Sequence, residues 1–196
     1  MRYQMLENLN ILLGVSGGIA AYKVVDLAGK LTAAGARINT VMTENACRLV
    51  GQKSFEAVTC SAVFTSLWNM PDEYKIGHIA LVDWTDIVVV APATANIIGK
   101  IANGICDDLL STTLCAAWRL IKSEAALLVP AMNDNMWNNP AVQRNVKTVK
   151  EMGFQLIGPV EGRLACGTEG IGRMAEPQDI LEALEKIASK INKRKV

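Results

Sequence analysis

The sequence has little that would suit a nucleic acid or a membrane. Of its 196 residues, 20 are basic and 19 are acidic, so a net charge of +1 provides no broad cationic surface for a polyanion. No apolar run approaches the length of a membrane span, and residues 1–10 lack the profile of a signal peptide. We therefore expect neither a nucleic acid nor a membrane as partner.

Cysteines are also few and follow no metal-binding or disulfide pattern. There are five, an odd number, without a C-x-x-C spacing, which argues against a disulfide framework and against a metal centre. This usage predicts a reducing cytoplasm as the setting. Cys106 and Cys115 stand in apolar, helix-like surroundings and are predicted to be buried as small hydrophobes.

The remaining sequence is typical of one globular α/β domain over residues 1–196, being 51% hydrophobic and 20% charged. Short apolar runs predict buried strands, and amphipathic patterns between them predict helices. The strands are expected at 10–15, 37–42, 86–91 and 125–129. The helices are expected at 20–35, 94–103, 107–118, 139–153 and from 177 onward. Such alternation predicts a single doubly wound parallel sheet of the Rossmann or flavodoxin-like type.

Ligands of such sheets bind beyond the carboxyl ends of the strands, so the loops there are candidate sites. After the first strand, Ser16 and Gly17 open a helix whose backbone N–H groups suit a phosphate. The loop is not G-x-G-x-x-G, and the second strand ends at Thr43 without an acid for a ribose. A mononucleotide is therefore favoured over a dinucleotide, with a plain tight turn as the alternative.

Two later loops carry hydroxyl and amide groups. Ala93, Thr94, Ala95 and Asn96 could support a flat polar ring against the backbone, although Thr94 could equally be a simple helix N-cap. Asn133 could donate hydrogen bonds to a carboxylate, although an Asx-turn would also explain it.

The single histidine and one cysteine complete the candidates. His78 precedes the central strand and, near these loops, would be the side chain able to act as a base at neutral pH. Residues 161–174 hold Cys166 among four glycines and show neither helical nor strand periodicity. A mobile flap (about 160–175) that places a thiol over a ligand would explain this composition; an idle surface loop is the alternative.

Four motifs in order identify a resemblance. They are His78 with the following Trp84-Thr85-Asp86, PATANIIGKIANGICDDLLST (92–112), PAMNDNMW (130–137) and RLACGTEGIGRM (163–174). Over residues 10–186 the chain resembles the homo-oligomeric flavin-containing cysteine decarboxylases, and among them the phosphopantothenoylcysteine decarboxylases of coenzyme A biosynthesis.

The resemblance implies FMN as cofactor and His78 and Cys166 as catalytic residues. It implies substrate binding by Asn133, Met136 and Ala165. The implied FMN contacts are Ser16, Gly17, Thr43, Ala93, Thr94, Ala95, Asn96 and Ala131. Homotrimers or dodecamers, with FMN near subunit contacts, are also implied.

The implied reaction converts 4′-phosphopantothenoylcysteine (PPC) to 4′-phosphopantetheine, as a carboxy-lyase. Direct decarboxylation would leave an unstabilised carbanion, so the flavin first oxidises the CH2–SH group to a thioaldehyde. Loss of CO2 then gives an enethiol, and reduction with a proton from Cys166 gives the saturated thiol. The flavin accepts two electrons in the first step and returns them in the last, so it ends in its starting oxidation state.

Other functions stay open. Lantibiotic-type decarboxylases of peptide C-terminal cysteine share the histidine and the asparagine but stop at the enethiol, so the flap cysteine favours the coenzyme A reaction. Flavin prenyltransferases lack this combination of motifs. Non-catalytic FMN-binding regulatory subunits carry acidic extensions or have lost a catalytic residue, and a nicotinamide-dependent oxidoreductase would lack flavin absorbance. Many bacterial members are fused to a PPC synthetase; because the chain ends after its last helix, we expect a separate synthetase or an excised domain.

Overall fold

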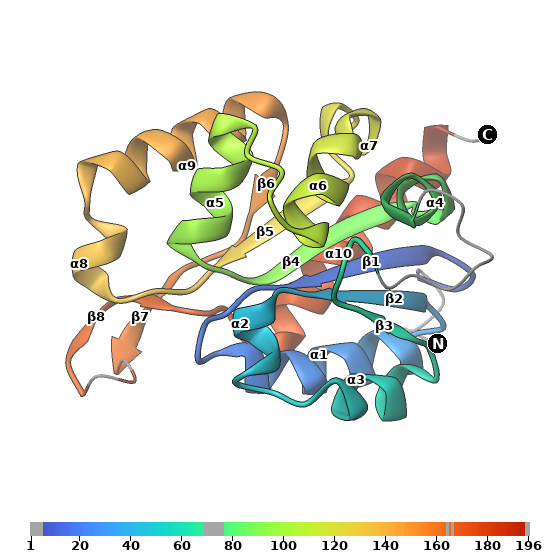
Figure 1. Cartoon of the computed structure of the whole chain (residues 1–196), viewed down its shortest axis with the longest axis horizontal. Coiled ribbons are helices and arrows are strands. Elements are labelled where there is room, and N and C mark those ends of the chain that lie inside the picture. The colour runs from blue at the N-terminus through green and yellow to red at the C-terminus, as the bar shows by residue number, and fades with distance from the viewer. Residues whose placement is uncertain (1–5, 69–76, 164, 166, 195–196) are drawn as a thin grey trace.

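The computed structural model describes residues 6–68, 77–163, 165 and 167–194. Six parallel strands form one sheet in the order β3-β2-β1-β4-β5-β6 (Figure 1). Their bounds are β1 Asn10–Val15, β2 Arg37–Met42, β3 Val63–Phe64, β4 Ile87–Ala93, β5 Ala126–Pro130 and β6 Gln155–Leu156. The strand order reverses between β1 and β4, which is the switch point where such sheets bind ligands.

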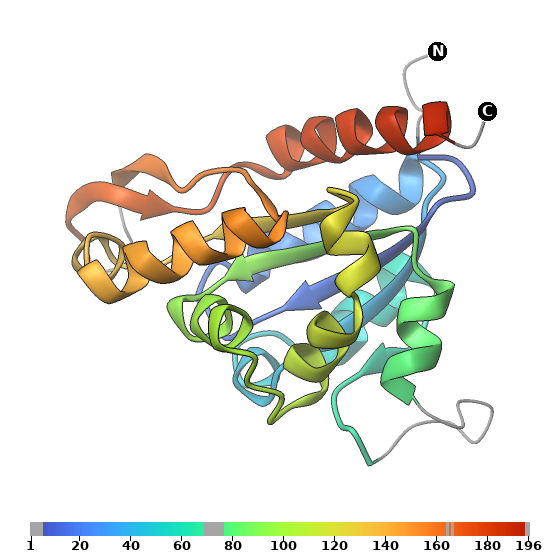
Figure 2. The ribbon, with the colours of Figure 1, turned by 90° about the horizontal axis from the view of Figure 1, so that it is seen from above.

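Helices cover both faces of this sheet (Figure 2). The core on one face includes side chains of α1 Ala21–Ala33, α3 Gln52–Thr59 and α10 Pro177–Arg194. The core on the other includes side chains of α4 Gly77–Trp84, α5 Ala95–Asn103, α6 Leu109–Ala116, α7 Trp118–Lys122 and α9 Pro140–Met152. Two short helices, α2 Glu44–Cys47 and α8 Asp134–Trp137, lie in the loops after β2 and β5.

Side chains of the central strands alternate between the two covered faces of the sheet, which explains why these strands are almost wholly apolar. Leu13 and Val89 belong to the core under α1, whereas Leu12 and Val88 belong to the core under α5 and α6. Successive side chains of a strand point to opposite faces, so a strand covered on both faces needs apolar residues at every position. The predicted doubly wound α/β fold is confirmed.

Most predicted elements are confirmed, with the bounds of β1 and β2 as expected. The helix predicted to start at Asn139 has its N-cap there: Asn139 Oδ1 accepts from the Ala141 N–H at 2.8 Å, and Pro140 is the first helical residue. β4 extends to Ala93, beyond the predicted end at 91. The elements β3, β6, α2, α3, α4, α7 and α8 were not predicted.

The flap segment differs from its sequence prediction. β7 Val160–Arg163 and β8 Glu169–Arg173 form an antiparallel two-stranded ribbon, so the expectation of no strand structure is wrong. Gly162 lies opposite Gly170 in this ribbon. Their lack of side chains hides the pattern that would reveal a strand.

The expected burial of Cys106 and Cys115 is also wrong, because both are exposed. The predicted helix 107–118 is divided: α6 begins after the N-cap Asp108 and ends at Ala116. Cys106 therefore precedes the helix. Cys115 lies in α6 beside the buried Leu114, which faces the core.

No helix in the described ranges is both long and apolar enough to cross a bilayer.

Candidate functional site

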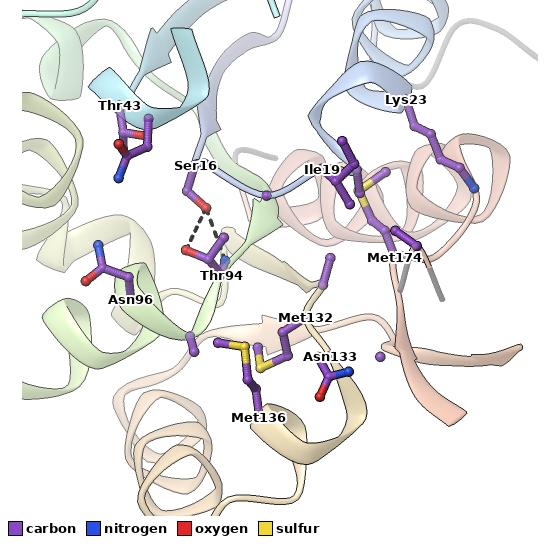
Figure 3. A pocket seen from close by; sticks show the side chains of 18 of the residues that line it. Ser16, Ile19, Lys23, Thr43, Thr94, Asn96, Met132, Asn133, Met136 and Met174 are labelled. Carbon is purple, nitrogen blue, oxygen red and sulfur yellow. Dashed lines mark hydrogen bonds between the residues drawn. The ribbon is translucent and has the colours of Figure 1, made fainter. Parts of the chain in front are cut away.

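A cavity of about 1050 Å³ opens at the carboxyl ends of β1, β2, β4 and β5. Its walls come from the loops after these strands and from the β7–β8 ribbon. Figure 3 shows side chains from these separate segments directed toward one space. This is the location that the switch-point rule predicts.

Ser16 joins the loops after β1 and β4. Its buried hydroxyl donates to the Pro92 carbonyl at 2.6 Å and accepts from the Thr94 N–H at 3.1 Å. The Thr94 Oγ1 also lies 3.1 Å from the Ser16 Oγ, as Figure 3 shows. The two loops at the switch point are thus fixed to each other.

Threonine caps shape the same side of the cavity. Thr43 Oγ1 accepts from the Ala46 N–H at 3.2 Å and begins α2. Thr94 Oγ1 accepts from the Ile97 N–H at 3.4 Å and begins α5. The N-cap that the sequence offered as the alternative for Thr94 is therefore present, and Thr94 still lines the cavity.

Glycine at position 17 is required by the close approach of the first loop to α2. A Cβ on Gly17 would lie 2.4 Å from the Cβ of Asn45 and 3.0 Å from its carbonyl carbon. A side chain there would separate the two loops. Gly17 thus allows the first loop to pack directly against Asn45, and its backbone lines the cavity.

The fourth loop is joined to the ribbon through the backbone. The Met132 N–H donates to the Gly172 carbonyl at 2.9 Å. A Cβ on Gly172 would lie 2.0 Å from the Met132 carbonyl oxygen, so only glycine permits this approach. Asn133 Oδ1 accepts from the Asn135 N–H at 2.9 Å, which is the predicted alternative of an Asx-turn and begins α8.

Charged side chains lie at two places around the cavity. Lys100 Nζ is 2.6 Å from both Asp107 Oδ1 and Asp108 Oδ2. Burial acts to lower the pKa of Lys100, but the hydrogen bonds to both carboxylates outweigh it and raise the pKa above its usual range. The same hydrogen bond with Lys100 lowers the pKa of Asp107.

On the ribbon side, Glu176 bridges two cations. It accepts from Lys23 Nζ at 3.1 and 3.3 Å and from Arg173 Nη2 at 2.6 Å. The hydrogen bond with Lys23, followed by the one with Arg173, lowers the pKa of the Glu176 carboxyl against the opposing effect of burial.

Ten of the predicted site residues line this cavity. They are Ser16, Gly17, Thr43, Thr94, Ala95, Asn96, Ala131, Asn133, Met136 and Ala165. Ala93 does not: it is fully buried, and its carbonyl accepts from the Ala131 N–H at 3.2 Å. Its predicted direct contact with a cofactor is therefore corrected to a supporting position beneath the loop.

His78 does not lie in the cavity of its own chain, so its expected closeness to these loops is wrong. It occupies the first turn of α4, whose last residue, Trp84, accepts from Asn10 Nδ2 at 2.7 Å. Asn10 begins β1, so α4 leads to the amino ends of the strands, whereas the cavity lies at their carboxyl ends. Cys166, the other predicted catalytic residue, lies outside the described residues.

Among the residues that line the cavity, sequence reasoning missed the cationic ones, which are Lys23, Lys100, Arg163 and Arg173. Lys23 could have been predicted to line the cavity, because it lies in the first turn of the helix that follows the first loop. Arg163 and Arg173 flank the flap glycines and were visible in the motif without a role. Within the described part of the chain, no group of three His, Cys, Asp or Glu side chains is placed to hold a metal ion.

The sequence profile of the Flavoprotein family matches residues 1–189. The chain belongs to the Flavoprotein family. A curated relative is the coenzyme A biosynthesis bifunctional protein CoaBC of Bacillus subtilis (strain 168), 47% identical over 182 residues. That alignment covers 93% of this chain and 44% of the relative, so the chain spans less than half the length of this two-activity protein.

Solved structures of this Flavoprotein member's relatives have the same fold. A serine-for-cysteine mutant of a PPC decarboxylase, complexed with pantothenoylaminoethenethiol, matches with a TM-score of 0.78 and 35% identity over 91% of this chain and 97% of that one. The FMN-dependent cysteine decarboxylase SpaF matches with a TM-score of 0.78 and 34% identity over 94% of this chain and 99% of that one.

Proposed function

We propose that this chain is an FMN-dependent decarboxylase that converts PPC to 4′-phosphopantetheine in coenzyme A biosynthesis. The observation that carries the proposal is that one cavity combines a mononucleotide-type wall, the Asn133 loop and the β7–β8 ribbon. The coenzyme A pathway in the name of the bifunctional relative CoaBC and the activity in the name of the PPC decarboxylase structure support it.

The residues at the polar wall fit FMN. Gly17 and Gly18 present backbone at the first loop, just before α1, and Thr43, Asn45 and Asn96 add polar side chains. Backbone N–H groups near a helix N-terminus suit a phosphate, while hydroxyl and amide groups suit a ribityl chain. At about 1050 Å³ the cavity reaches the upper end of roughly 300–1,000 Å³ for ligand pockets, which leaves room beside a flavin. When bound, FMN would supply the acceptor and later the donor of two electrons.

Asn133 would hold the carboxylate of the substrate. Its Oδ1 is engaged by the Asn135 N–H, which fixes the amide so that Nδ2 is the end that donates. A neutral donor binds the carboxylate without the strong stabilisation that a cation would give it. It therefore opposes loss of the charged group as CO2 less than a lysine would.

His78 would serve a neighbouring copy of the chain. As the histidine of the sequence it is suited to accept a proton when the substrate thiol is oxidised. Because it does not line the cavity of its own chain, it would act in the cavity of a neighbour in a homotrimer or dodecamer. Cys166, on the connection between β7 and β8, would deliver the final proton to the enethiol carbon.

The chain would work as one flavoprotein decarboxylase domain of residues 1–196, with the flap at about 160–175. PPC synthetase would be its neighbour, on a separate polypeptide or in a longer protein, as the two-activity name of the relative suggests. A cytoplasmic location suits this pathway.

The test is to incubate the purified protein with PPC and FMN and to follow CO2 and 4′-phosphopantetheine. Stoichiometric release of both supports the proposal. FMN bound without PPC turnover, in an assay where a PPC decarboxylase is active, would refute it.

The second candidate is oxidative decarboxylation of a peptide C-terminal cysteine. It is favoured by the equal TM-score of the cysteine decarboxylase SpaF. A peptide ending in cysteine, offered in the same assay, separates the two functions: release of CO2 with a peptide enethiol would support this candidate.

A further inference from the structure

Three cations line the ribbon side of the cavity. Lys23 belongs to the first turn of α1, Arg163 ends β7 and Arg173 ends β8. The carboxylates beside them, Glu176 and the cross-strand Glu169, are not among the described residues that line the cavity. The three cationic residues thus line the cavity, whereas these two carboxylates do not.

Arg173 is held in place by its surroundings. Its Nη2 donates to Glu176, and its Nη1 lies 3.0 Å from where a Cβ on Gly162 would be. Its Nε is buried and has no hydrogen-bond partner among the described residues. A guanidinium has five N–H donors, and a single carboxylate shared with Lys23 does not satisfy them.

The other charged lining residues are matched. Lys100 is paired with both Asp107 and Asp108. Glu44 forms an ion pair with Arg48 one turn along the chain. The excess of positive charge is therefore confined to the ribbon side.

We infer that Lys23, Arg163 and Arg173 form a subsite for the phosphate of the substrate. The inference deepens the proposed function and rests on it for the identity of the ligand. Figure 3 shows Lys23 and Met174 on one side of the pocket and Asn133 on another. An elongated substrate that places its carboxylate at Asn133 would extend along the ribbon side toward Lys23, with Arg163 and Arg173 lining the same side.

FMN carries the same kind of phosphate, so its position matters. Ser16, Thr43 and Thr94 lie together in Figure 3, apart from Lys23. They suit the flavin phosphate, which leaves the cationic side for the second ligand. The subsite would select phosphorylated small molecules over peptides, which lack this anion.

The experiment titrates the FMN-loaded protein with 4′-phosphopantetheine and with pantetheine by calorimetry. We expect the phosphorylated ligand to bind about 100-fold more tightly, as charge-assisted hydrogen bonds of this kind permit. Lys23→Gln and Arg173→Gln should each lower that preference about tenfold and leave pantetheine affinity unchanged. Lys30→Gln is the matched control, because Lys30 lies on the same helix but is paired with Asp26. This variant should keep the preference for the phosphorylated ligand.

Two further measurements, a third variant and a salt series, separate the subsite from effects on folding and on cofactor binding. Arg163→Gln breaks no contact with Glu176 and should also lower the preference. The preference of the wild-type protein should fall as salt rises. Equal affinity of the wild-type protein for both ligands would overturn the subsite, as would equal losses for both ligands in all three variants. A change in the FMN-over-riboflavin preference instead would assign the cations to the cofactor and also overturn it.

Failure of the proposed function gives a different result. A wild-type protein that binds 4′-phosphopantetheine more tightly than pantetheine, with the preference lost in the variants, supports the subsite even if PPC is not decarboxylated. A protein that decarboxylates PPC and its dephosphorylated form with equal KM retains the function and refutes the subsite.

Discussion

The backbone of Gly172 meets the backbone of Met132 so closely that a Cβ at position 172 would lie 2.0 Å from the Met132 carbonyl oxygen. The hydrogen bond between them joins the ribbon to the loop that carries Asn133. The ribbon is therefore attached at β8 to the Asn133 loop, which lines the cavity.

Gly172→Ala should detach the ribbon from this loop. Overpacking at a closed contact costs about 1–3 kcal/mol, and we expect activity to fall at least tenfold. Hydrogen exchange at the Met132 amide should rise, which can be followed by mass spectrometry. Gly29→Ala is the control, because nothing lies within 4 Å of a Cβ there, and it should stabilise α1 slightly. Unchanged Met132 protection in Gly172→Ala would contradict the contact.

Asp108→Ala should destabilise the fold more than Asp107→Ala. Asp108 caps α6 by accepting from the Ser111 N–H at 2.7 Å and also binds Lys100, so its loss should cost about 1–2 kcal/mol. Asp107 contributes an exposed ion pair to the same lysine, and its loss should change little. Urea unfolding measures both; equal destabilisation would show that the cap is not the stronger contribution.

Glu176→Gln should lower stability at neutral pH but not in acid. The folded pKa of Glu176 is lowered, so its contribution is present above the ordinary value of 4.5 and is lost as pH falls through the folded pKa. The side chain is 44% exposed, so screening limits the contribution to about 0.5 kcal/mol. Urea unfolding at a series of pH values checks this, with Glu182→Gln on the same helix as control. A difference between Glu176→Gln and wild type that persists in strong acid would contradict the ion-pair origin.

His78→Asn and Asn133→Asp should each be inactive alone and complement each other when co-expressed. If each active site takes its histidine from one copy and its asparagine from another, random assembly leaves about a quarter of the sites intact. Single-turnover decarboxylation of PPC measures that fraction, with native mass spectrometry confirming mixed oligomers. Mixed oligomers without activity would place both residues in one subunit's site.

Cys166→Ser should release CO2 but leave the product oxidised. Without the thiol proton donor, the enethiol should accumulate, detectable by its ultraviolet absorbance and by mass. Formation of 4′-phosphopantetheine at the wild-type rate would exclude Cys166 as the donor.

The sequence predicts the fold well where one local cause decides the structure. β1 and β2 are continuous apolar runs ended by turn residues, and α9 begins at an Asn-Pro pair that both caps and orients its first turn. The cavity follows in the same way, because the loops of Ser16, Thr94 and Asn133 must meet once the strands are parallel.

Tertiary relations account for what was missed. The ribbon contains glycines with low strand propensity, and it forms against Met132, which is remote in sequence. The position of His78 depends on where α4 packs against the sheet, and no residue near His78 in the sequence determines that. Cys115 stands in an apolar sequence pattern, but its side of α6 faces solvent. The pattern alone therefore wrongly predicted that Cys115 is buried.

The hydroxyl of Ser16 has an energetic consequence for the cofactor. Because it joins the loops after β1 and β4, the conformational entropy of ordering them is lost during folding and not when a ligand arrives. Affinity for a flavin then depends on this internal bond as well as on direct contacts. A change that loosens the two loops would weaken binding without removing any group that touches the ligand.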